Sequence, residues 1–339
     1  MATLKYDIAG DQIDGARDYQ EDAFLITHLS NDEENQQALV IVADGMGGHA
    51  AGNVASNMAV QAFNKHVASN YPVEDASLIP DILRASVVRA NDALSETVKE
   101  TAALAGMGCT MVGILLAHGK LWWASVGDSH LYVIRDNQIS KLNADHSYGG
   151  FLDRMAADGK HIEVDPSLSR NMLMSALTGA EIAEIDVSTE PYILQPNDNI
   201  IVCSDGMDTL PREDILKHGG WAPDAKQTAS KMLQAVTDAE RPRQDNTTIV
   251  NIRTSLVEPK AAAPAYDYGS EAEGQVEDAT ETADQVDAAA KADFGDEKSG
   301  GMGKIIAIVA VLAILGGAGA FFLTQKSETP APVLSLIHI

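Results

Sequence analysis

Acidic side chains in this sequence stand repeatedly at the ends of apolar, strand-like runs. Such positions are buried in a folded sheet, where a bare carboxylate costs several kcal/mol of free energy. A single Asp-Gly pair after a strand is usually only a turn. Repetition of the pattern suggests instead that these carboxylates converge on cations, whose charge compensates theirs. The positions are Glu21 with Asp22, Asp44 with Gly45, Asp128, Asp205 and Asp245.

The chemistry of these donors selects the cation. All of them offer oxygen, and the sequence has neither a Cys pair at zinc spacing nor an H-E-x-x-H helix. Hard oxygen ligands favour Mg²⁺ or Mn²⁺, and two such ions about 4 Å apart can activate a water and hold a phosphoryl oxygen. The chain also lacks a G-x-x-x-x-G-K-[ST] loop, a G-x-S-x-G elbow and a dinucleotide fingerprint. Metal-assisted chemistry on a phosphate ester is therefore indicated.

The elements that must position these residues alternate between strand and helix. Apolar runs predict strands, and apolar residues at three- and four-residue steps predict helices. The strands are expected at 23–27, 38–43, 110–117, 121–126, 131–134, 200–203 and 247–252, and the helices at about 51–69, 79–104, 211–218 and 223–239.

The order of these elements predicts the fold class. The turn pairs Gly119-Lys120 and Asp136-Asn137 are typical of hairpins and indicate antiparallel neighbours. Two early helices followed by a meander of strands favour α+β, with stacked sheets flanked by helices, over a doubly wound parallel fold. Residues 149–178 show no clear period and are interpreted as an inserted loop region over a site.

Composition limits the classes of protein that fit. Of 339 residues 45% are hydrophobic, which excludes a wholly disordered chain. The formal net charge of −25 argues against non-specific nucleic-acid binding, because phosphates would meet like charge. Two cysteines, Cys109 and Cys203, form no disulfide framework and fit a reducing compartment. No signal peptide is visible at the N-terminus, so the first segment is expected in the cytoplasm.

The C-terminal part has a different composition. Residues 267–297 hold 11 acidic residues and one basic residue, Lys291, and few large apolar side chains. A solvated, disordered linker is expected there rather than its alternative, a long amphipathic helix. Residues 305–323 carry no charge, and about 20 apolar residues cross a bilayer as a helix. A single membrane span is therefore favoured over a buried core helix.

These features divide the chain into four expected parts. Residues 1–255 form the catalytic-type domain, 256–303 the acidic Ala/Pro-rich linker, 304–324 the transmembrane helix and 325–339 a short tail. From residue 334 the tail resembles a translated sequencing adaptor and is interpreted as artefactual or truncated. The expected location is the cytoplasmic membrane, crossed once, with the N-terminal domain facing the cytoplasm.

A set of short motifs carries a resemblance to a known family. In order along residues 17–247, they resemble the metal-dependent protein Ser/Thr phosphatases of type 2C, the bacterial branch most closely. The resemblance implies a four-layer αββα sandwich of two antiparallel sheets flanked by helices, with a metal site at one edge. The motifs are RDYQED (17–22), ADGMGGHAAG (43–52), GCT (108–110), VGDS (126–129), DHS (145–147), LTG (177–179), SDG (204–206) and QDNT (244–247).

The same resemblance implies roles for the acidic residues around two Mn²⁺ or Mg²⁺ ions. Asp44 looks like the carboxylate that bridges the ions, and Gly45 offers its backbone carbonyl to one of them. Asp205 and Asp245 would complete the first ion's ligands. The remaining assignments are Glu21 and Asp22 for the second ion, partly through water, and Asp128 for a third, weaker metal found in bacterial members.

Other positions match or depart from the family pattern. Arg17 resembles the phosphate-binding arginine, since its planar fork suits two phosphate oxygens; the alternative is a surface ion pair. Eukaryotic members have His directly after Asp-Gly, where this chain has Met46. His49, three residues further on, is either the general acid or a structural histidine. Asp208 stands three residues after Asp205, where relatives have Asp at four, which leaves the third metal open.

Two functions remain in view. The first is a membrane-tethered phosphatase that opposes a Ser/Thr kinase and acts on phosphorylated proteins. Phosphoserine or phosphothreonine would dock on Arg17, and a hydroxide bridging the two metal ions would attack phosphorus in line without a phosphoenzyme. The alternative is a catalytically silent type 2C fold that serves as a membrane-tethered binding or signalling module. The complete set of metal-ligating residue types favours the enzyme.

Overall fold

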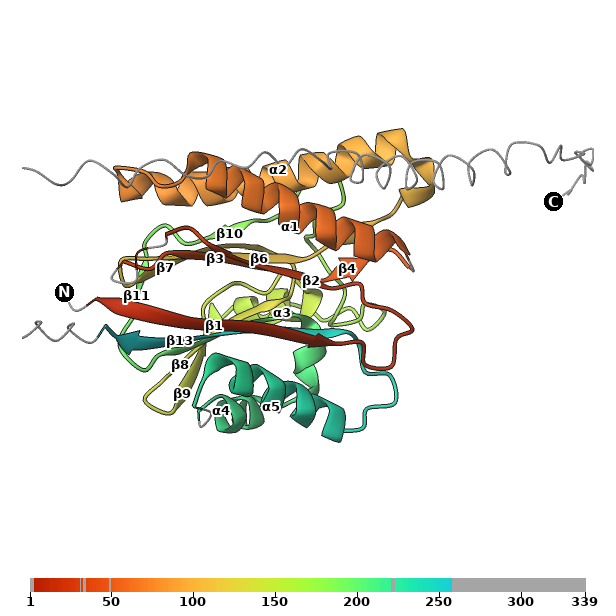
Figure 1. Cartoon of the computed structure of the whole chain (residues 1–339). Helices are drawn as coiled ribbons and strands as arrows, with labels where there is room; N and C mark the ends of the chain where they lie inside the picture. Colours follow the sequence, from red (N-terminus) through yellow and green to blue (C-terminus); the bar gives the residue numbers. More distant parts are fainter. Residues whose placement is uncertain (1–2, 31, 33–34, 49, 221–222, 258–339) are drawn as a thin grey trace, which may run out of the picture. The chain divides into compact units, whose positions relative to one another are not determined.

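Two antiparallel sheets lie face to face, with a pair of helices on the outer side of each (Figure 1). The computed structural model describes residues 3–257, apart from 31, 33–34, 49 and 221–222. The chain divides into two units, Met1–Ala263 and Pro264–Ile339, and the second unit lies outside the described residues. The predicted α+β class, with two antiparallel sheets flanked by helices, is confirmed.

The first sheet joins the beginning and the end of the described chain. The first and the last strand of the described chain pair along their whole length, from Leu4 opposite Leu256 to Ile13 opposite Thr247. Across the sheet the order is β1 (Leu4–Ile13), β13 (Thr247–Leu256), β12 (Asn199–Cys203), β8 (His130–Arg135) and β9 (Gln138–Lys141).

Strand β1 corrects the sequence analysis, which predicts no strand before residue 23. Leu4 and Tyr6 are buried, whereas Lys5 and Asp7, which each follow one of them, are exposed. The apolar residues therefore alternate with charged ones, as they do in an edge strand with one face in solvent. A search for continuous apolar runs misses such a strand, because only half of its residues are apolar.

The second sheet is assembled mainly from the meander and the first two predicted strands. Across the sheet the order is β10 (Asp186–Val187), β7 (Lys120–Val126), β6 (Met111–Ala117), β3 (Ala38–Ala43) and β2 (Ala23–His28), and β11 (Tyr192–Ile193) also pairs with β7. A small two-stranded ribbon, β4 (Gly45–Met46) with β5 (Gly108–Cys109), extends from this region. The short strands β4, β5, β9, β10 and β11 are absent from the predicted set.

The faces of β3 show why the sheets stack. All six residues of β3 are buried, because its side chains alternate between two different cores. Leu39 and Ile41 pack into the core shared with the first two helices. Val40 and Val42 pack into the core between the sheets, together with residues of β6, β12 and β13. A strand covered on both faces is a continuous apolar run in the sequence, and the strand predicted at 38–43 is confirmed.

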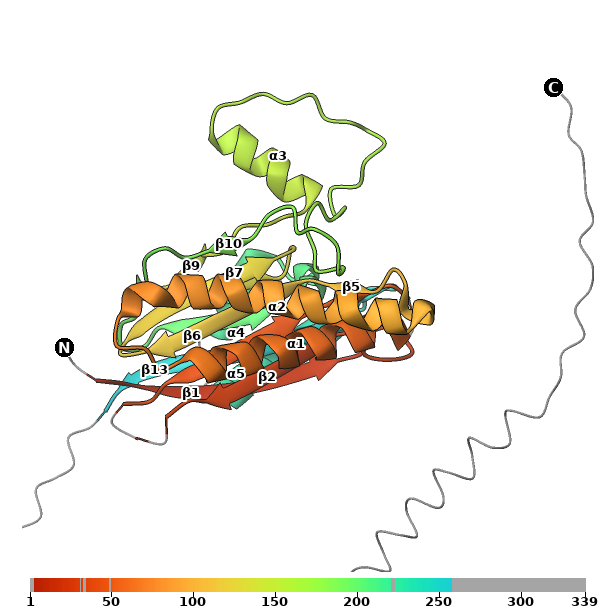
Figure 2. The same ribbon diagram turned by 90° about the horizontal axis from the view of Figure 1, so that it is seen from above.

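Helices cover the outer faces of both sheets (Figure 1), and Figure 2 looks down on the pair that lies over the second sheet. The second sheet carries α1 (Ala50–Asn70) and α2 (Ile79–Glu100), which contribute Phe63 and Leu83 to the shared core. The first sheet carries α4 (Arg212–Gly219) and α5 (Ala225–Asp238), whose apolar faces form a third core. Short 3₁₀ helices cover Ala76–Leu78, Ala102–Leu104 and Asp205–Thr209. The predicted helices match these bounds within two residues, except that α2 ends at Glu100 rather than 104.

Two further details differ from the sequence analysis. A helix, α3 (Tyr148–Ala157), begins the segment interpreted as a loop, and Ser147 caps it by accepting a hydrogen bond from Gly150 at 3.0 Å. The Gly149-Gly150 pair conceals this helix, because glycine has low helix propensity. The first hairpin turn is His118-Gly119, one residue before the predicted pair, whereas the Asp136-Asn137 turn is confirmed by positive φ at both residues.

The C-terminal predictions fall outside the described residues. They are the linker beyond residue 257, the membrane span at 304–324 and the tail at 325–339. Strand β13 runs to Leu256, one residue past the predicted domain boundary at 255. Within residues 3–257, as far as they are described, no helix has both the length and the apolar character that a membrane crossing requires.

Candidate metal centre

Acidic residues from five segments meet at one edge of the sandwich. Because neighbouring strands are antiparallel, the ends of β3, β7 and β12 lie at the same edge as the starts of β2 and β13. Two contacts between the sheets confirm the meeting: Ser204 donates to Asp22 at 2.7 Å, and the backbone N–H of Glu21 donates to Asn246 at 2.9 Å. The acidic side chains that the sequence singles out are thus neighbours in space.

Asp22 is a buried carboxylate with one oxygen bonded and one oxygen without a partner. Its Oδ2 accepts the hydrogen bond from Ser204, whose hydroxyl in turn accepts from the backbone N–H of Thr248 at 2.9 Å. Its Oδ1 has no hydrogen-bond partner among the described residues. Burial raises the pKa of Asp22 to about 6, against the opposing effect of the Ser204 hydrogen bond. A buried acceptor of this kind is suited to a cation.

Asp44 and Asp205 interact directly. Burial of its carboxyl group raises the pKa of Asp44 well above the usual range, and the charges of Asp22 and Asp205 raise it further. Burial also raises the pKa of Asp205, while the hydrogen bond to Asp44 lowers it. The backbone of Asp44 is fixed by Thr110, which accepts from the Asp44 N–H at 3.1 Å and donates its own N–H to the Asp44 carbonyl at 2.9 Å. Carboxyl groups this close share a proton unless a cation neutralises them.

Asp128 adds a further carboxylate from the end of β7. It is buried, and burial followed by the charge of Asp205 raises the pKa of Asp128 to about 7. The adjacent Ser129 exchanges a 2.7 Å hydrogen bond with Thr110, so the residue beside Asp128 contacts the residue that holds Asp44. The structure therefore brings the predicted ligand of the third metal close enough to Asp205 for the two charges to interact.

Glu21 and Gly45 lie in a tightly packed part of the site. Glu21 is buried, and its carbonyl accepts a hydrogen bond from Ser56 of α1 at 2.6 Å. A Cβ at Gly45 would overlap the carbonyls of Glu21 and Gly52, and a Cβ at Gly52 would overlap the carboxylate of Glu21. Glycine at both positions is thus a condition for the close approach of Glu21 to the Asp44-Gly45 corner.

Arg17 lies beside the acidic residues and pairs with one of them. Its Nη2 is 2.6 Å from Oδ2 of Asp245, and its side chain is 51% exposed. That hydrogen bond is the main cause that raises the pKa of Arg17, and the charges of Glu21 and Asp44 also contribute. The ion-pair alternative is therefore present in the structure, although the pair sits within the acidic site and leaves other guanidinium donors available.

The departures from the family pattern have mixed outcomes. His49 lies outside the described residues, so its role stays a prediction. Met46 pairs with Gly108 in the β4–β5 ribbon. The carboxylate of Asp208 accepts a 2.9 Å hydrogen bond from Nε2 of the buried His130, whose Nδ1 accepts from Lys141 at 2.8 Å. Asp208 is thus tied to a histidine, an arrangement that sequence reasoning missed because nothing in the spacing of these three residues reveals it.

The donors fit a hard divalent cation, although they are partly satisfied by one another. Among the described residues, no three His, Cys, Asp or Glu side chains are already arranged as a metal-binding group. The reason is visible in the contacts, since Asp44 and Asp205 share a hydrogen bond and Asp245 pairs with Arg17. Oδ1 of Asp22 and Oδ1 of Asp205 remain buried without partners. Oxygen donors of raised pKa with unused lone pairs fit Mg²⁺ or Mn²⁺.

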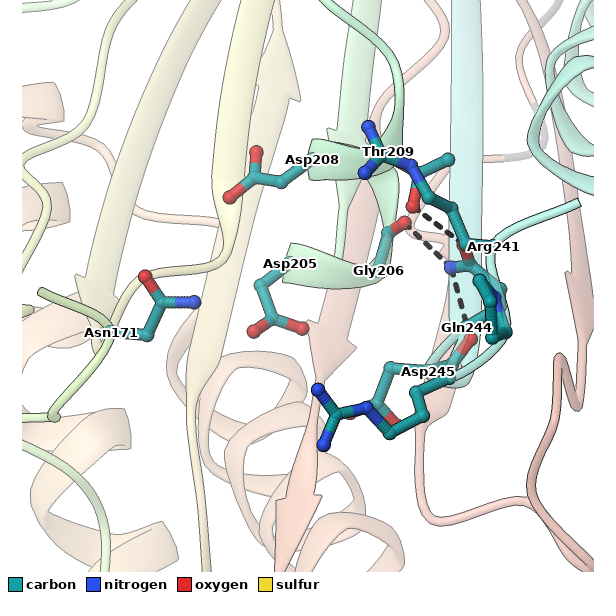
Figure 3. A pocket seen from close by; sticks show the side chains of 10 residues that line it. Asn171, Asp205, Gly206, Asp208, Thr209, Arg241, Gln244 and Asp245 are labelled. Atoms are coloured by element: carbon teal, nitrogen blue, oxygen red, sulfur yellow. Dashed lines mark hydrogen bonds between the residues drawn. The ribbon is translucent and has the colours of Figure 1, made fainter. Parts of the chain in front are cut away.

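A cavity of about 640 Å³ opens on this site. In Figure 3, Asp205 and Asp208 point into it, with Asn171 on one side and Arg241 and Gln244 on the other. Asn171 comes from the segment after α3, which supports the expectation that residues 149–178 lie over a site. The arginines in this lining, at 241 and 243, were not selected from the sequence. Two arginines that flank a proline, in so acidic a chain, are a signal that could have identified them.

Known proteins share this fold and this sequence pattern. The sequence profile of the family described as protein phosphatase 2C matches residues 16–247. A protein of Listeria welshimeri named serine/threonine phosphatase stp is 32% identical over 210 residues, which cover 59% of this chain and 82% of that one. The serine/threonine protein phosphatase PstP of Mycobacterium tuberculosis is 29% identical over 245 residues, 71% of this chain and 44% of that one. The chain therefore spans less than half of the mycobacterial protein.

Solved structures agree. The crystal structure of the M. tuberculosis phosphatase PstP matches with a TM-score of 0.60 and 28% identity, covering 74% of this chain and 98% of that one. A structure of the PstP catalytic domain in complex with two manganese ions matches with a TM-score of 0.60 and 28% identity, covering 75% of this chain and all of the other. The αββα fold with an acidic edge thus defines a metal-dependent phosphatase class. The chain belongs to the protein phosphatase 2C family.

Proposed function

We propose that this chain is a metal-dependent protein phosphatase that hydrolyses phosphoserine and phosphothreonine in proteins. The observation that carries the proposal is the meeting of acidic residues from five separate segments around unpartnered buried oxygens. Alone, each of these acidic residues would be interpreted as part of a turn or as a helix cap. Together, in a chain of the protein phosphatase 2C family, they form a site for two divalent cations.

The residues divide the work of the site between them. Asp44, Asp205 and Asp245 would hold one Mn²⁺ or Mg²⁺ ion, and Glu21 and Asp22 would help to hold the other. The carbonyl of Gly45 would serve one of these two ions, and Asp128 would hold a weaker third. When bound, such ions supply Lewis acidity and lower the pKa of water, which provides a nucleophile at neutral pH. Thr110, Ser204 and Asn246 fix the backbone and side chains of these ligands, and so keep the site preorganised.

Arg17 would bind the phosphate of the substrate. Its guanidinium is held toward the acidic edge by Asp245, and half of the side chain faces solvent, where a phosphate group can reach it. Two parallel N–H donors on two phosphate oxygens orient the group as well as attract it. Protonation of the leaving alkoxide would fall either to His49 or to water. Of the described histidines near the site, His130 is hydrogen-bonded to Asp208, and Nδ1 of the buried His146 accepts from the backbone N–H of Gly127 at 3.0 Å.

Completeness of the site supports an enzyme over the silent binding module. A module without catalytic function has no need for every acidic ligand type, yet Glu21, Asp22, Asp44, Asp205 and Asp245 are all present and adjacent. The relatives with the names quoted above are themselves described as phosphatases. A calorimetric Mn²⁺ titration separates the two functions, because the silent module would bind the ion poorly.

The cellular setting is a second part of the proposal, and only the sequence supports it. The uncharged stretch 305–323 would anchor the domain to the cytoplasmic membrane through a linker that includes the acidic residues 267–297. A Ser/Thr kinase would supply the phosphorylated proteins. Fractionation of cells that express the full chain or residues 1–257 tests the anchor. Recovery of both forms in the soluble fraction would remove it from the proposal.

Hydrolysis of a phosphothreonine peptide by the purified full chain tests the activity. We expect release of phosphate with Mn²⁺ and none after chelation with EDTA. Asp44→Asn should lose the activity, while Asp81→Asn, which removes the same charge from the first turn of α2, should retain it. Turnover that persists without divalent metal would contradict the mechanism.

A further inference from the structure

Two arginines lie at the mouth of the acidic cavity without a role in the proposed metal site. Arg241 and Arg243 belong to the loop between α5 and β13, and both line the 640 Å³ cavity together with Asp205, Asp208 and Asp245. Both arginines are exposed. They are therefore accessible to a molecule that enters the cavity.

The loop that carries them is fixed in place by Gln244. The Nε2 of this buried side chain donates to the carbonyl of Gly206 at 2.9 Å, and its Oε1 accepts from Thr209 at 2.5 Å (Figure 3). The Nε2 also donates to Thr247 at 3.0 Å. The backbone carbonyl of Gln244 also accepts from Ala16 at 2.8 Å, next to Arg17. Pro242 restricts the backbone between the two arginines. The backbone that carries the two arginines is thus held beside the 3₁₀ helix Asp205–Thr209.

Neither guanidinium forms an ion pair with another described residue. Five other arginines do: Arg17, Arg89, Arg135, Arg154 and Arg170 are paired with Asp245, Asp92, Asp198, Glu184 and Asp153, respectively. Unpaired cations next to an acidic site are unexpected in a chain with a net charge of −25. Since the net charge repels anionic substrates at long range, local cations at the cavity mouth are what such a substrate would contact.

We propose that Arg241 and Arg243 form a subsite for a second anionic group of the substrate, next to the phosphorylated residue. The group is a carboxylate or a second phosphate on the same polypeptide. The preferred substrates are accordingly phosphopeptides that are acidic or phosphorylated more than once. This inference rests on the proposed phosphatase function, and it concerns the flanking residues rather than the scissile phosphate, which is assigned to Arg17.

The size of the expected preference follows from exposure. A single exposed ion pair contributes little free energy, and charge-assisted guanidinium contacts are stronger when they are bidentate. Two such contacts should favour an acidic peptide over a neutral one by roughly tenfold in kcat/KM. Because the contacts form on binding, the preference should lie mainly in KM.

The experiment compares three phosphothreonine peptides with the full chain and Mn²⁺. One has neutral flanks, one has aspartates near the phosphothreonine, and one has a second phosphothreonine instead. We expect both anionic peptides to exceed the neutral one in kcat/KM, and the excess to shrink as salt is raised. Peptides with aspartates and with phosphate separate the two sources of the anion, since a subsite for phosphate alone would favour only the doubly phosphorylated peptide.

Variants assign the preference to the two arginines. The double variant R241Q/R243Q should bring the ratio between anionic and neutral peptides close to one, while R241K/R243K should keep much of it. Arg84→Gln is the matched control, because it removes an exposed arginine from α2, away from the lining of the cavity. Thermal melting of each variant shows whether it folds. If the double glutamine variant does not fold, the single variants R241Q and R243Q keep the test decisive, because each should lose part of the preference.

Two failures are distinguishable. Equal kcat/KM for all three peptides with the wild-type chain, or a preference that survives in R241Q/R243Q, overturns the subsite and leaves the phosphatase function intact. Absence of hydrolysis for all peptides and for an aryl phosphate in Mn²⁺ removes the proposed function, and the subsite with it.

Discussion

Strand β12 has an aspartate at each end, and the surroundings of the two are opposite. Asp198, just before the strand, is 1% exposed and is fully satisfied. Its two oxygens accept from the guanidinium of Arg135 at 2.7 and 2.6 Å, and the backbone N–H of Gln195 adds a bond at 2.8 Å. Asp205, just after the strand, faces the carboxylates of Asp44 and Asp245, and its Oδ1 has no partner among the described residues.

The difference separates structural charge from functional charge. A buried carboxylate with a bidentate arginine is a closed unit that has no need of a ligand. A carboxylate that meets other carboxylates is destabilising by itself and becomes favourable only when a cation binds. The carboxylates gathered around Asp205 therefore destabilise the metal-free fold, and a divalent ion would relieve this repulsion. Asp198, at the other end of β12, causes no such repulsion because Arg135 neutralises it.

The largest expected effect concerns the carboxylate at the centre of the acidic edge. Asp44→Asn removes a donor that would neutralise charge in the transition state, a contribution of several kcal/mol, so kcat should fall by about a thousandfold or more. Steady-state hydrolysis of an aryl phosphate in Mn²⁺ measures it, with Asp81→Asn as the control. Activity within tenfold of wild type would show that Asp44 is as structural as Asp198.

The next largest effect is expected at the closed end of the strand. Asp198→Ala leaves the partly buried Arg135 without its partner, and breaking a pair of this kind costs about 3–5 kcal/mol. Urea unfolding should show that loss, while the Mn²⁺ affinity of the folded variant should be unchanged. Replacing both partners by apolar residues should recover part of the stability. Loss of Mn²⁺ binding without loss of stability would contradict the contrast between the two ends.

The same contrast explains how much could be predicted from the sequence. Asp44, Asp205 and Asp245 could be selected because they adjoin apolar runs, and strands buried on both faces, such as β3, are visible as such runs. Strand β1 could not, because its charged residues interrupt the pattern on the solvent side.

Partnerships between distant residues are the other limit. The pairs Asp198–Arg135 and Asp208–His130 join residues 63 and 78 positions apart. Sequence spacing carries no information on such contacts, because they depend on how the strands align in the folded sheet. For the same reason, the sequence alone could not distinguish Asp198 from Asp205 by its partner, only by the Gly that follows the second.

The third prediction concerns pH. Burial raises the pKa of Asp22 from 3.8 to about 6, so the folded state binds this proton more tightly than the unfolded state does. The contribution of Asp22 to stability is therefore present below pH 3.8 and is lost as pH rises through about 6. A shift of about two units corresponds to about 3 kcal/mol. Asp128, whose pKa is raised to about 7, acts in the same direction.

Chemical denaturation of the metal-free chain between pH 4 and 8 measures this loss. Added Mn²⁺ should reverse it at the upper end, since a cation replaces the proton as the partner of these carboxylates. A free energy of unfolding that stays constant over this range, or that rises with pH, would show that deprotonation of these carboxylates does not destabilise the metal-free fold.

The smallest expected effect is the sharpest comparison, because the same substitution is made at the two ends of one strand. Asp205→Asn keeps the shape and a hydrogen bond to Asp44 but removes a charge that repels its neighbours, so the metal-free chain should gain about 1 kcal/mol of stability. Asp198→Asn removes a charge that its arginine stabilises, so it should lose stability. Urea midpoints at pH 7.5 measure both.

Mn²⁺ should stabilise the wild type and Asp198→Asn much more than Asp205→Asn. Equal signs for the two substitutions would show that the ends of β12 do not differ as their contacts indicate.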